Sequence, residues 1–492
     1  MTKLLRLVIA INVAITLQQT AVSQSLSINT TGAAANPSAI LDVSSTAKGM
    51  LIPRMDRTQR NAIATPATGL LIFQDAPDST GFYYYNGSAW LWLATASTSQ
   101  GWLTTGNTGT DSAINFLGTL DNKPLMLRQN NLWMGQLNTS KHNYFIGAGS
   151  GFNTTGQNNT AFGDSTLFNN ISGNENTAVG NYALQNHKSN PYNVAVGEYA
   201  LNKDTSGISN AAFGTSALRF NIDGIQNTAL GTNAMYSHLH GGLNTAVGYQ
   251  AMEFDSAGTL NVAVGWRALR NNKIGAQNTA IGVGALEVDS SGNYNTAVGR
   301  SAGFFNKRGS YNVAVGMESA VFSDTADVTT FVGYLSGYYN RSHYNTGIGA
   351  YSLAYNNFTT GASTTGAENT GLGYGAGFEI NQGAKNTAVG FQSMNGGGFF
   401  INGSRNVAVG DSSLFLFANG NDNVAIGYKT LSKSLNSSQN VAVGSRALIN
   451  FNNSAYPNTA VGYSSMDSTT TGTANTAVGR FSLHQLRNPG RW

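Results

Sequence analysis

Few residues of this 492-residue sequence have the types and spacing that catalysis or metal binding requires. His238 and His240, in the segment Ser-His-Leu-His, are two positions apart, so an extended backbone would place both imidazoles on one side as a weak metal site. The acidic residues are scattered through variable segments rich in Gly and Asn, for example Asp204, Asp223, Asp255 and Asp289. We interpret these acids as solvated turn residues. We therefore predict no catalytic residue, no metal site and no cofactor.

A second set of side chains is spaced more regularly, because an aromatic residue directly follows a recurring glycine in several parts of the chain. The members of this set are Tyr249, Trp266, Tyr334, Tyr374, Phe391, Tyr428 and Tyr463. On an exposed corner, these rings could stack on sugars or on a protein partner. The alternative, which we favour, is that they cover neighbouring repeat units. If they bind, the receptor would be an unknown surface glycan or protein.

These side chains are positioned by a short repeat, Asn-x-Ala-Val-Gly. Twenty copies begin between Asn143 and Asn475, and fourteen of the nineteen spacings between them are seventeen residues long. So regular a register predicts that each such unit is one structural coil, as in solenoid proteins. The Asn and Gly of the motif are expected to be structural. Examples are Asn159 and Gly163, Asn176 and Gly180, Asn193 and Gly197, Asn244 and Gly248, Asn261 and Gly265, Asn295 and Gly299, and Asn440 and Gly444.

The alternation of side chains along a strand assigns a direction to each position of the motif, counted from the Asn as position one. Positions one, three and five (Asn, Ala, Gly) should face into a thin roll, against a small residue and a Leu or Met of a return strand. Positions two and four carry mostly Thr, Val, Ile, Leu or Phe, an apolar stripe that must be covered from outside. Three chains packed around an axis would cover it.

Each coil then has room for two short strands and two turns, at about 3.3 Å per strand residue. The Asn side chains would form hydrogen bonds along the stack, and the closing Gly would allow a sharp turn. We predict an all-β protein, a parallel β-solenoid of about 20 coils preceded by a small β-rich module.

Two insertions break the register. The copy at Asn345 is followed by a 24-residue interval that contains the extra segment 358–366, and the copy at Asn386 by a 20-residue interval that contains 396–400. Insertions in solenoids often extend from the binding face, whereas a tolerant turn also accumulates them neutrally. Both interpretations stay open.

The N-terminal part of the chain is organised differently. Residues 1–23 combine basic residues, an apolar run from Leu7 to Leu17 and small residues before the expected cleavage point, which is the layout of a secretory signal peptide. That run is too short for a spanning helix, which needs about 20 residues. We predict an exported chain with a β-rich leader module at 24–99, a connector at 100–142 and the roll at 143–492.

Composition narrows the possible partners. The chain has no cysteine, so disulfides and thiolate metal sites are excluded. Its net charge is +4 without a basic run, which gives no support to a nucleic-acid partner. Only 10% of residues are charged, but a hydrophobic content of 41% favours a folded chain over a disordered one.

The motif Asn-Thr/Val-Ala-Val/Ile-Gly, followed three residues later by a small residue, resembles the head repeat of trimeric autotransporter adhesins (YadA-like heads). The resemblance covers about residues 143–483 and implies a left-handed parallel β-roll that forms homotrimers. The sequence departs from that family in lacking a heptad stalk, and the short segment 480–492 after Gly479 is not enough for a membrane anchor. We therefore expect either that the chain is a fragment or that an unknown separate component anchors the protein. Residues 39–55, 68–73 and 83–90 resemble a leader module of fibre proteins secreted by Gram-negative bacteria, which implies a cell-surface or extracellular location.

These patterns favour a non-enzymatic protein. We expect an exported structural and adhesive fibre that attaches to a host, a surface or a neighbouring cell. The alternative is a fibre component of a phage-like or secreted particle. An ice-binding solenoid fits less well, because the Thr at position two is interrupted by Val, as at Val194 and Val262.

Overall fold

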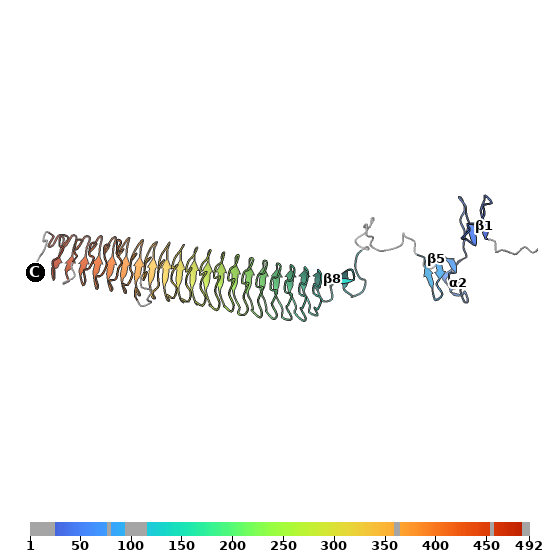
Figure 1. Cartoon of the computed structure of the whole chain (residues 1–492), viewed down its shortest axis with the longest axis horizontal. Coiled ribbons are helices and arrows are strands. Elements are labelled where there is room, and N and C mark those ends of the chain that lie inside the picture. Colours follow the sequence, from blue (N-terminus) through green and yellow to red (C-terminus); the bar gives the residue numbers. More distant parts are fainter. Residues whose placement is uncertain (1–24, 76–79, 94–115, 359–364, 453–456, 485–492) are drawn as a thin grey trace, which may run out of the picture. The chain divides into compact units, whose positions relative to one another are not determined.

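The computed structural model describes residues 25–75, 80–93, 116–358, 365–452 and 457–484 (Figure 1). The chain divides into two compact units, Met1–Leu117 and Gly118–Trp492. Nearly all regular structure in the described ranges is β-strand. The predicted signal peptide at 1–23 lies outside the described residues.

The first unit contains two small sheets and one short helix. Its elements are β1 (Leu26–Ile28), β2 (Leu41–Val43), β3 (Arg54–Met55), α2 (Arg57–Asn61), β4 (Leu71–Gln74), β5 (Gly81–Tyr85) and β6 (Trp90–Trp92). Strands β1 and β2 pair in parallel, and β3 to β6 form a four-stranded sheet in sequence order. A turn at Asn86 and Gly87 joins β5 to β6, and the Asn86 N–H donates to the carbonyl oxygen of Ala89 at 3.0 Å. Helix α2 begins at a capping box formed by Asp56 and Gln59.

The second unit begins with an antiparallel hairpin of β7 (Leu125–Gln129) and β8 (Leu132–Asn138). Its turn residues, Asn130 and Asn131, both have positive φ, as a tight two-residue hairpin turn requires. Strand β8 also pairs antiparallel with β9, the first strand of the roll. The described part of the predicted connector therefore covers the edge that the first coil would otherwise leave unpaired.

Each coil of the roll contributes one short strand. These strands are β9 (Asn143–Ile146), β10 (Thr160–Phe162), β11 (Thr177–Val179), β12 (Val194–Val196), β13 (Ala211–Phe213), β14 (Thr228–Leu230), β15 (Thr245–Val247), β16 (Val262–Val264), β17 (Thr279–Ile281), β18 (Thr296–Val298), β19 (Val313–Val315), β20 (Thr330–Val332), β21 (Thr346–Ile348), β22 (Thr370–Leu372), β23 (Thr387–Val389), β24 (Val407–Val409), β25 (Val424–Ile426), β26 (Val441–Val443), β27 (Thr459–Val461) and β28 (Thr476–Val478). Consecutive strands pair in parallel, with each motif residue opposite its equivalent in the next coil, as Ala178 is opposite Ala195 (Figure 1). The predicted parallel β-solenoid is confirmed.

The interior of the roll is narrow and is filled as the motif predicts. The Ala at position three is fully buried in coil after coil, for example Ala178, and packs with the buried Ala183 and Leu184 at positions eight and nine. The closing Gly at position five has no room for a side chain. A Cβ on Gly197, whose φ is +135°, would lie 2.4 Å from the carbonyl oxygen of Gly214 in the next coil.

The predicted return strand is wrong. The segment after each closing Gly is a series of turns, in which Tyr182 and Leu184 have φ values of 61° and 48°. The physical reason is that Ala183 and Leu184 are adjacent and both point inward, whereas a strand would send them to opposite faces. The turns still bond along the stack, as the Leu184 N–H donates to the carbonyl oxygen of Ala200 at 3.0 Å.

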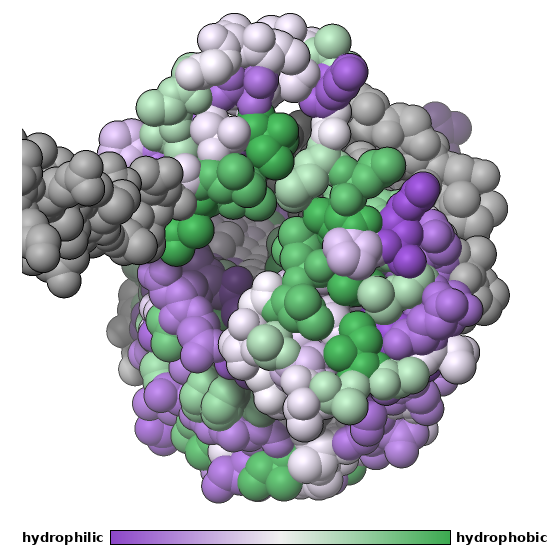
Figure 2. Space-filling view, turned by 90° about the vertical axis from the view of Figure 1, so that its right-hand side faces the viewer, coloured by the Kyte–Doolittle hydropathy of each residue, from purple (hydrophilic) through white to green (hydrophobic). Residues whose placement is uncertain are grey.

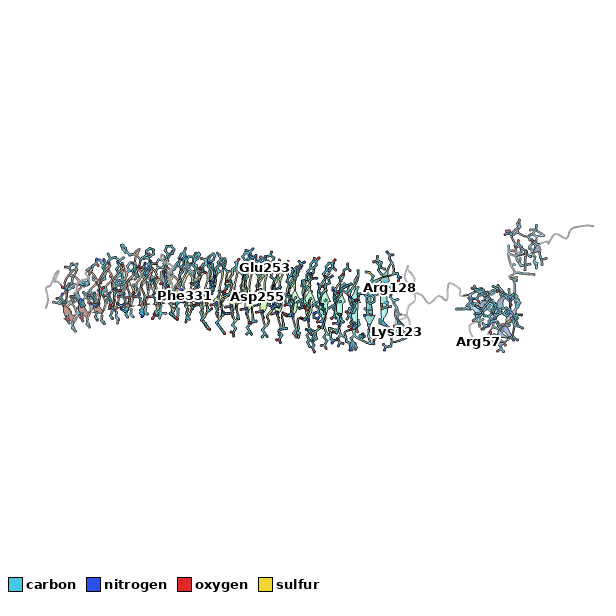
Figure 3. The ribbon with its side chains drawn as sticks, turned by 60° about the horizontal axis from the view of Figure 1, so that its bottom comes forward. Arg57, Lys123, Arg128, Glu253, Asp255 and Phe331 are labelled. Atoms are coloured by element: carbon cyan, nitrogen blue, oxygen red, sulfur yellow. The ribbon has the colours of Figure 1, made fainter. Side chains whose placement is uncertain are left out.

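In two coils the large side chain is at position three and the small residue at position nine, the reverse of the usual arrangement. In place of the Ala-Leu pair, one coil has Phe145 with Gly151 and another has Phe331 with Gly337, and both rings are fully buried. A Cβ on Gly337 would lie 2.4 Å from the Phe331 ring, so the ring occupies the space that Leu fills in other coils. Figure 3 shows Phe331 along the middle of the roll.

The outer face of the strands is an apolar stripe that the roll itself leaves uncovered. At position four the exposed fractions are 36% for Val179, 49% for Leu230 and 40% for Ile281. Residues at positions two and four are intermediate or exposed in all the strands from β10 to β28. The predicted second face is thus present, and within one chain it faces outward.

Candidate binding surface

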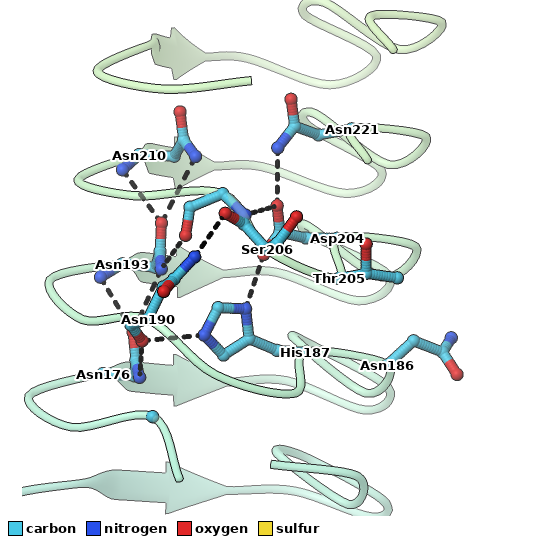
Figure 4. Close-up of polar contacts among 12 residues, drawn as sticks. Asn176, Asn186, His187, Asn190, Asn193, Asp204, Thr205, Ser206, Asn210 and Asn221 are labelled. Atoms are coloured by element: carbon cyan, nitrogen blue, oxygen red, sulfur yellow. Dashed lines mark hydrogen bonds and ion pairs between the residues drawn. The ribbon is translucent and has the colours of Figure 1, made fainter. Parts of the chain in front are cut away.

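The first polar column inside the roll is made by the repeat Asn residues, as predicted. The Asn193 N–H donates to Asn176 Oδ1 at 2.9 Å, and the Asn210 N–H donates to Asn193 Oδ1 at 3.0 Å (Figure 4). Each amide also closes its own coil, since Asn193 Nδ2 donates to the carbonyl oxygen of Gly207 at 3.0 Å. The Asn column therefore satisfies buried backbone groups, and its side chains are not free to bind a ligand.

A second buried polar column runs along position twelve, and sequence reasoning missed it. Its described members in the first half of the roll are Asn170, His187, Asp204, Asn221, His238, Asp255, Asn272, Asp289 and Asn306. Several of these side chains accept from the N–H of the Gly three residues later, as Asp204 Oδ1 does from Gly207 at 3.1 Å. The sequence pattern could have identified this column, because a polar residue recurs once in every coil and a Gly often follows it at a fixed distance.

The interpretation of the acids as solvated turn residues is therefore wrong for three of the four. Asp204, Asp255 and Asp289 are fully buried, while Asp223 is exposed. Figure 3 shows Asp255 in the middle of the roll. The coil folds its turn inward at position twelve, so a carboxylate there bonds to backbone and neighbouring side chains and has no contact with solvent.

His187 and Asp204 form a buried pair between adjacent coils. His187 Nδ1 lies 2.6 Å from Asp204 Oδ2, and His187 Nε2 lies 2.9 Å from the carbonyl oxygen of Asn190 (Figure 4). Both ring nitrogens thus have a hydrogen-bond partner in the interior of the roll. The second oxygen of Asp204 accepts from Asn221 Nδ2 at 2.6 Å. Both buried side chains are thus hydrogen-bonded, as buried polar groups require.

The weak metal site considered for His238 and His240 would need both imidazoles on one side, and the structure separates them. His238 is buried and its Nδ1 lies 2.7 Å from Asp255, while His240 is half exposed and its Nδ1 lies 2.7 Å from Asp223. The Nε2 of His238 lies 3.2 Å from Asn227 Nδ2, so both ring nitrogens contact neighbouring side chains of the buried interior. The segment turns between the two rings instead of staying extended. Among the described residues, no group of three or more potential ligands converges on a metal position.

Asp289 occupies the same column without a cationic neighbour. Its Oδ1 accepts from the N–H groups of Gly292 at 2.7 Å and Ser291 at 3.2 Å. Its Oδ2 lies 3.3 Å from Asn295 Nδ2. Burial raises the pKa of Asp289 from 3.8 to about 7, and these hydrogen bonds offset only part of that rise.

All seven aromatic residues that follow the repeat Gly are exposed, as one interpretation required. They are Tyr249, Trp266, Tyr334, Tyr374, Phe391, Tyr428 and Tyr463. The other interpretation also has support in the geometry, because Tyr374 stacks on Phe391 at 5.4 Å in the next coil. Trp266 lies under the guanidinium of Arg267 at 4.3 Å. A role of these rings in binding remains a proposal.

Further aromatic residues at positions ten and eleven were not predicted. Phe305, Phe322 and Tyr339 stack in successive coils, with ring centroids 5.0 and 4.7 Å apart. Their recurrence at the period of the repeat is the signal that could have identified them. Because positions eight and nine point inward, positions six, seven, ten and eleven form one outer surface, which we call the turn side. It lies across the Ala-Leu core from the apolar stripe of the strands.

The structure describes the two register breaks to different extents. Residues 359–364 of the first break lie outside the described residues. In the second break, Phe399 and Phe400 are exposed, and Ile401 returns to the core in a bridge with Ile380. Whether either break is a binding loop remains a prediction.

The comparison with protein families bears on the N-terminal unit. Residues 27–110 match the family model described as a phage tail like trimerisation region. The match supports self-association as a homotrimer and a fibre-like β-solenoid. It does not distinguish an autotransporter head from a phage-like fibre. Neither the curated proteins nor the solved structures contained a match to this chain.

The matched region has side chains suited to association. In β1 and β2, Leu26, Ile28, Leu41 and Val43 are all exposed by more than two-fifths of their surface. Hydrophobic residues are also visible at the molecular surface in Figure 2. Exposed apolar side chains this close together favour burial against other chains. In the described part of the chain, no helix is long and apolar enough to cross a bilayer.

Proposed function

We propose that this chain is an exported structural fibre protein that assembles as a homotrimer and presents its turn side for attachment to a host, a surface or a neighbouring cell. In this arrangement the apolar stripes of three rolls pack against one another. The leader at 24–99 starts assembly, and no catalytic step is involved.

The observation that carries the proposal is the match of residues 27–110 to a trimerisation region, on a chain whose strand stripe is uncovered. An apolar surface repeated in every coil is costly in water. Three identical stripes around one axis bury each other and add the trimer contact to every coil. The turn side remains outside, with its row of exposed aromatic rings.

The second candidate is a fibre component of a phage-like or secreted particle. The same match favours it, because the printed family is phage tail-like. Both candidates are trimeric fibres. They differ in whether the fibre is attached to a cell surface or to a particle.

Immunogold labelling of intact cells and of particles sedimented from the medium separates the candidates. A cell-surface adhesin predicts label on the outer surface of intact cells, and loss of attachment when the gene is deleted. A particle component predicts label on the ends of sedimented particles. Label confined to the cell interior would contradict both.

A further inference from the structure

A continuous groove runs along the turn side of the nine coils that begin between residues 295 and 440. Four hollows of about 230, 220, 320 and 550 Å³ follow one another along these coils. Neighbouring hollows share lining residues: Glu318 and Tyr338 join the first two, Tyr351 joins the second and third, and Gln392 joins the third and fourth. At about 4.8 Å per coil, this turn-side groove is roughly 40 Å long.

Aromatic rings form the floor of the first three hollows. Tyr351 lies 5.7 Å from Tyr374, which in turn stacks on Phe391, and Tyr355 lies 5.0 Å from Phe378. Each of these rings is at least partly exposed, although Tyr374 and Phe391 cover one face of each other. The same hollows are lined by polar groups, among them Ser301, Gln392 and Asn395. Flat apolar faces beside amide and hydroxyl groups match the two kinds of surface on a pyranose ring.

The fourth hollow is cationic. Lys429, Lys433 and Arg446 all line it and all are exposed. None of the three makes an ion pair with the described residues. Tyr428 and the hydroxyl of Ser412 complete the same wall. Asp411 lies beside this hollow and accepts from the Ser412 hydroxyl, so the three cations leave a net positive charge that attracts a polyanion.

We propose that the turn-side groove binds an extended acidic polysaccharide. Its pyranose rings lie on the aromatic floor, and its carboxylate or sulfate groups bind Lys429, Lys433 and Arg446. This inference rests on the proposed attachment function and names the class of ligand that the turn side takes. The groove stays open in the trimer, because the stripe that packs between chains is on the other side of the Ala-Leu core.

The distribution of charge favours a polysaccharide over a single-stranded nucleic acid. A nucleic acid carries a phosphate at every step and needs cations along its whole path. Here the cations without an ion-pair partner line the fourth hollow, and Glu318, which lines the aromatic part, is paired with Arg300 at 3.3 Å. Glu318 can accept hydrogen bonds from sugar hydroxyls, whereas among the described residues no cation lines that part to bind successive phosphates.

The test uses the purified full-length chain in biolayer interferometry. The probes are polygalacturonate, chondroitin sulfate, neutral dextran and a poly-dT oligonucleotide. We expect binding to one or both acidic polysaccharides, with no binding to dextran and a loss of affinity at high salt. The polygalacturonate and chondroitin sulfate arms separate carboxylate from sulfate recognition.

Two groove variants and two matched controls locate the site. K429A/K433A/R446A and Y338A/Y351A should each weaken polysaccharide binding by about tenfold or more, since they remove charge-assisted bonds or stacking faces. K188A/K203A/K273A removes three exposed cations outside the groove, and Y192A/Y344A removes two exposed rings elsewhere. Both controls should bind like wild type. Circular dichroism melting checks that all four variants remain folded.

Absence of binding to both acidic polysaccharides, or an equal loss in the controls, would overturn the inference. Tighter binding of poly-dT that depends on the same residues would also overturn it and assign the groove to nucleic acid. If cells attach normally while the purified chain ignores both polysaccharides, the inference fails and the proposed attachment function stands. If the chain binds polysaccharide but deletion of the gene leaves attachment unchanged, the inference stands and the proposed function fails.

Discussion

The imidazole of His187 and the carboxylate of Asp204 face each other across two adjacent coils, 2.6 Å apart and completely shielded from solvent. Their positions in the coil are equivalent, since both belong to the buried column of position twelve. Most other members of that column in this part of the roll are Asn, which is neutral and both donates and accepts. The structure thus places a hydrogen-bonded His–Asp pair where the flanking coils carry amides.

Removing one member of this pair should destabilise the roll. In Asp204→Ala the buried Nδ1 of His187 loses its hydrogen-bond partner, and we expect a loss of about 1–3 kcal/mol in the free energy of unfolding. The double variant H187N/D204N should recover most of this loss, because Asn170 and Asn221 already occupy the neighbouring places. Denaturant unfolding followed by circular dichroism measures both. Equal stabilities of Asp204→Ala and wild type would show that the pair is unimportant.

Asp289 should make stability depend on pH. Its pKa in the folded chain, about 7, is above its ordinary value of 3.8, so between these values the folded state holds a proton that the unfolded state has released. The free energy of unfolding should therefore fall by roughly 4 kcal/mol at most as the pH rises from about 4 to 7. It should stay low at higher pH.

Asp289→Asn should remove this dependence and raise the melting temperature at pH 8, with little change at pH 4. Asp223→Asn is the matched control, because Asp223 is exposed. A melting temperature of Asp289→Asn that follows the wild-type curve at every pH would contradict the assignment.

The repeat predicted the parts of the fold that depend on side-chain alternation in strands. The inward Ala, the Asn column and the outward stripe follow from the five-residue motif because a strand has a fixed period of two. The segment after the Gly could not be predicted in this way. There, Ala183 and Leu184 point inward together through alternating left- and right-handed backbone, a conformation that non-glycine residues rarely adopt.

The candidate surface was predicted only in part for the same reason. The aromatics at position six, such as Trp266, come directly after the strand and were found. Rings at positions ten and eleven, such as Tyr339, lie in the irregular turns, where no rule of alternation assigns a direction. The burial of the carboxylates in the same turn was missed as well, because Asp and Gly together indicate an exposed turn in most proteins.

The exchange of volume between Phe331 and Gly337 can be tested by reversing it. Phe331→Ala alone should leave a cavity and lower stability by about 3–5 kcal/mol. Gly337→Leu alone should clash with the ring, since a Cβ there would lie 2.4 Å from it. The double variant F331A/G337L restores the Ala-Leu pair of other coils. The backbone at position 337 can accept a Leu, because the φ of Gly337, +60°, is close to the 48° of Leu184. A double variant less stable than both single variants would contradict this account.

The exposed aromatics at position six should contribute to attachment without supporting the fold. Replacing Trp266 and Tyr428 together with Ala should reduce attachment of fibre-coated beads to the target surface and leave the melting curve unchanged, since both rings are over two-fifths exposed. Y192A/Y344A provides the control for a general loss of exposed rings. Attachment that survives the first change would assign those rings to covering neighbouring coils.

The mass of the purified full-length chain in solution tests the central claim most directly. Light scattering coupled to size exclusion gives that mass without reference to shape. Three chains joined along their apolar stripes predict three times the single-chain mass of 51.7 kDa, with no dissociation on dilution. A stable, soluble monomer of 51.7 kDa would contradict the account, because it would show that the stripe of positions two and four needs no partner.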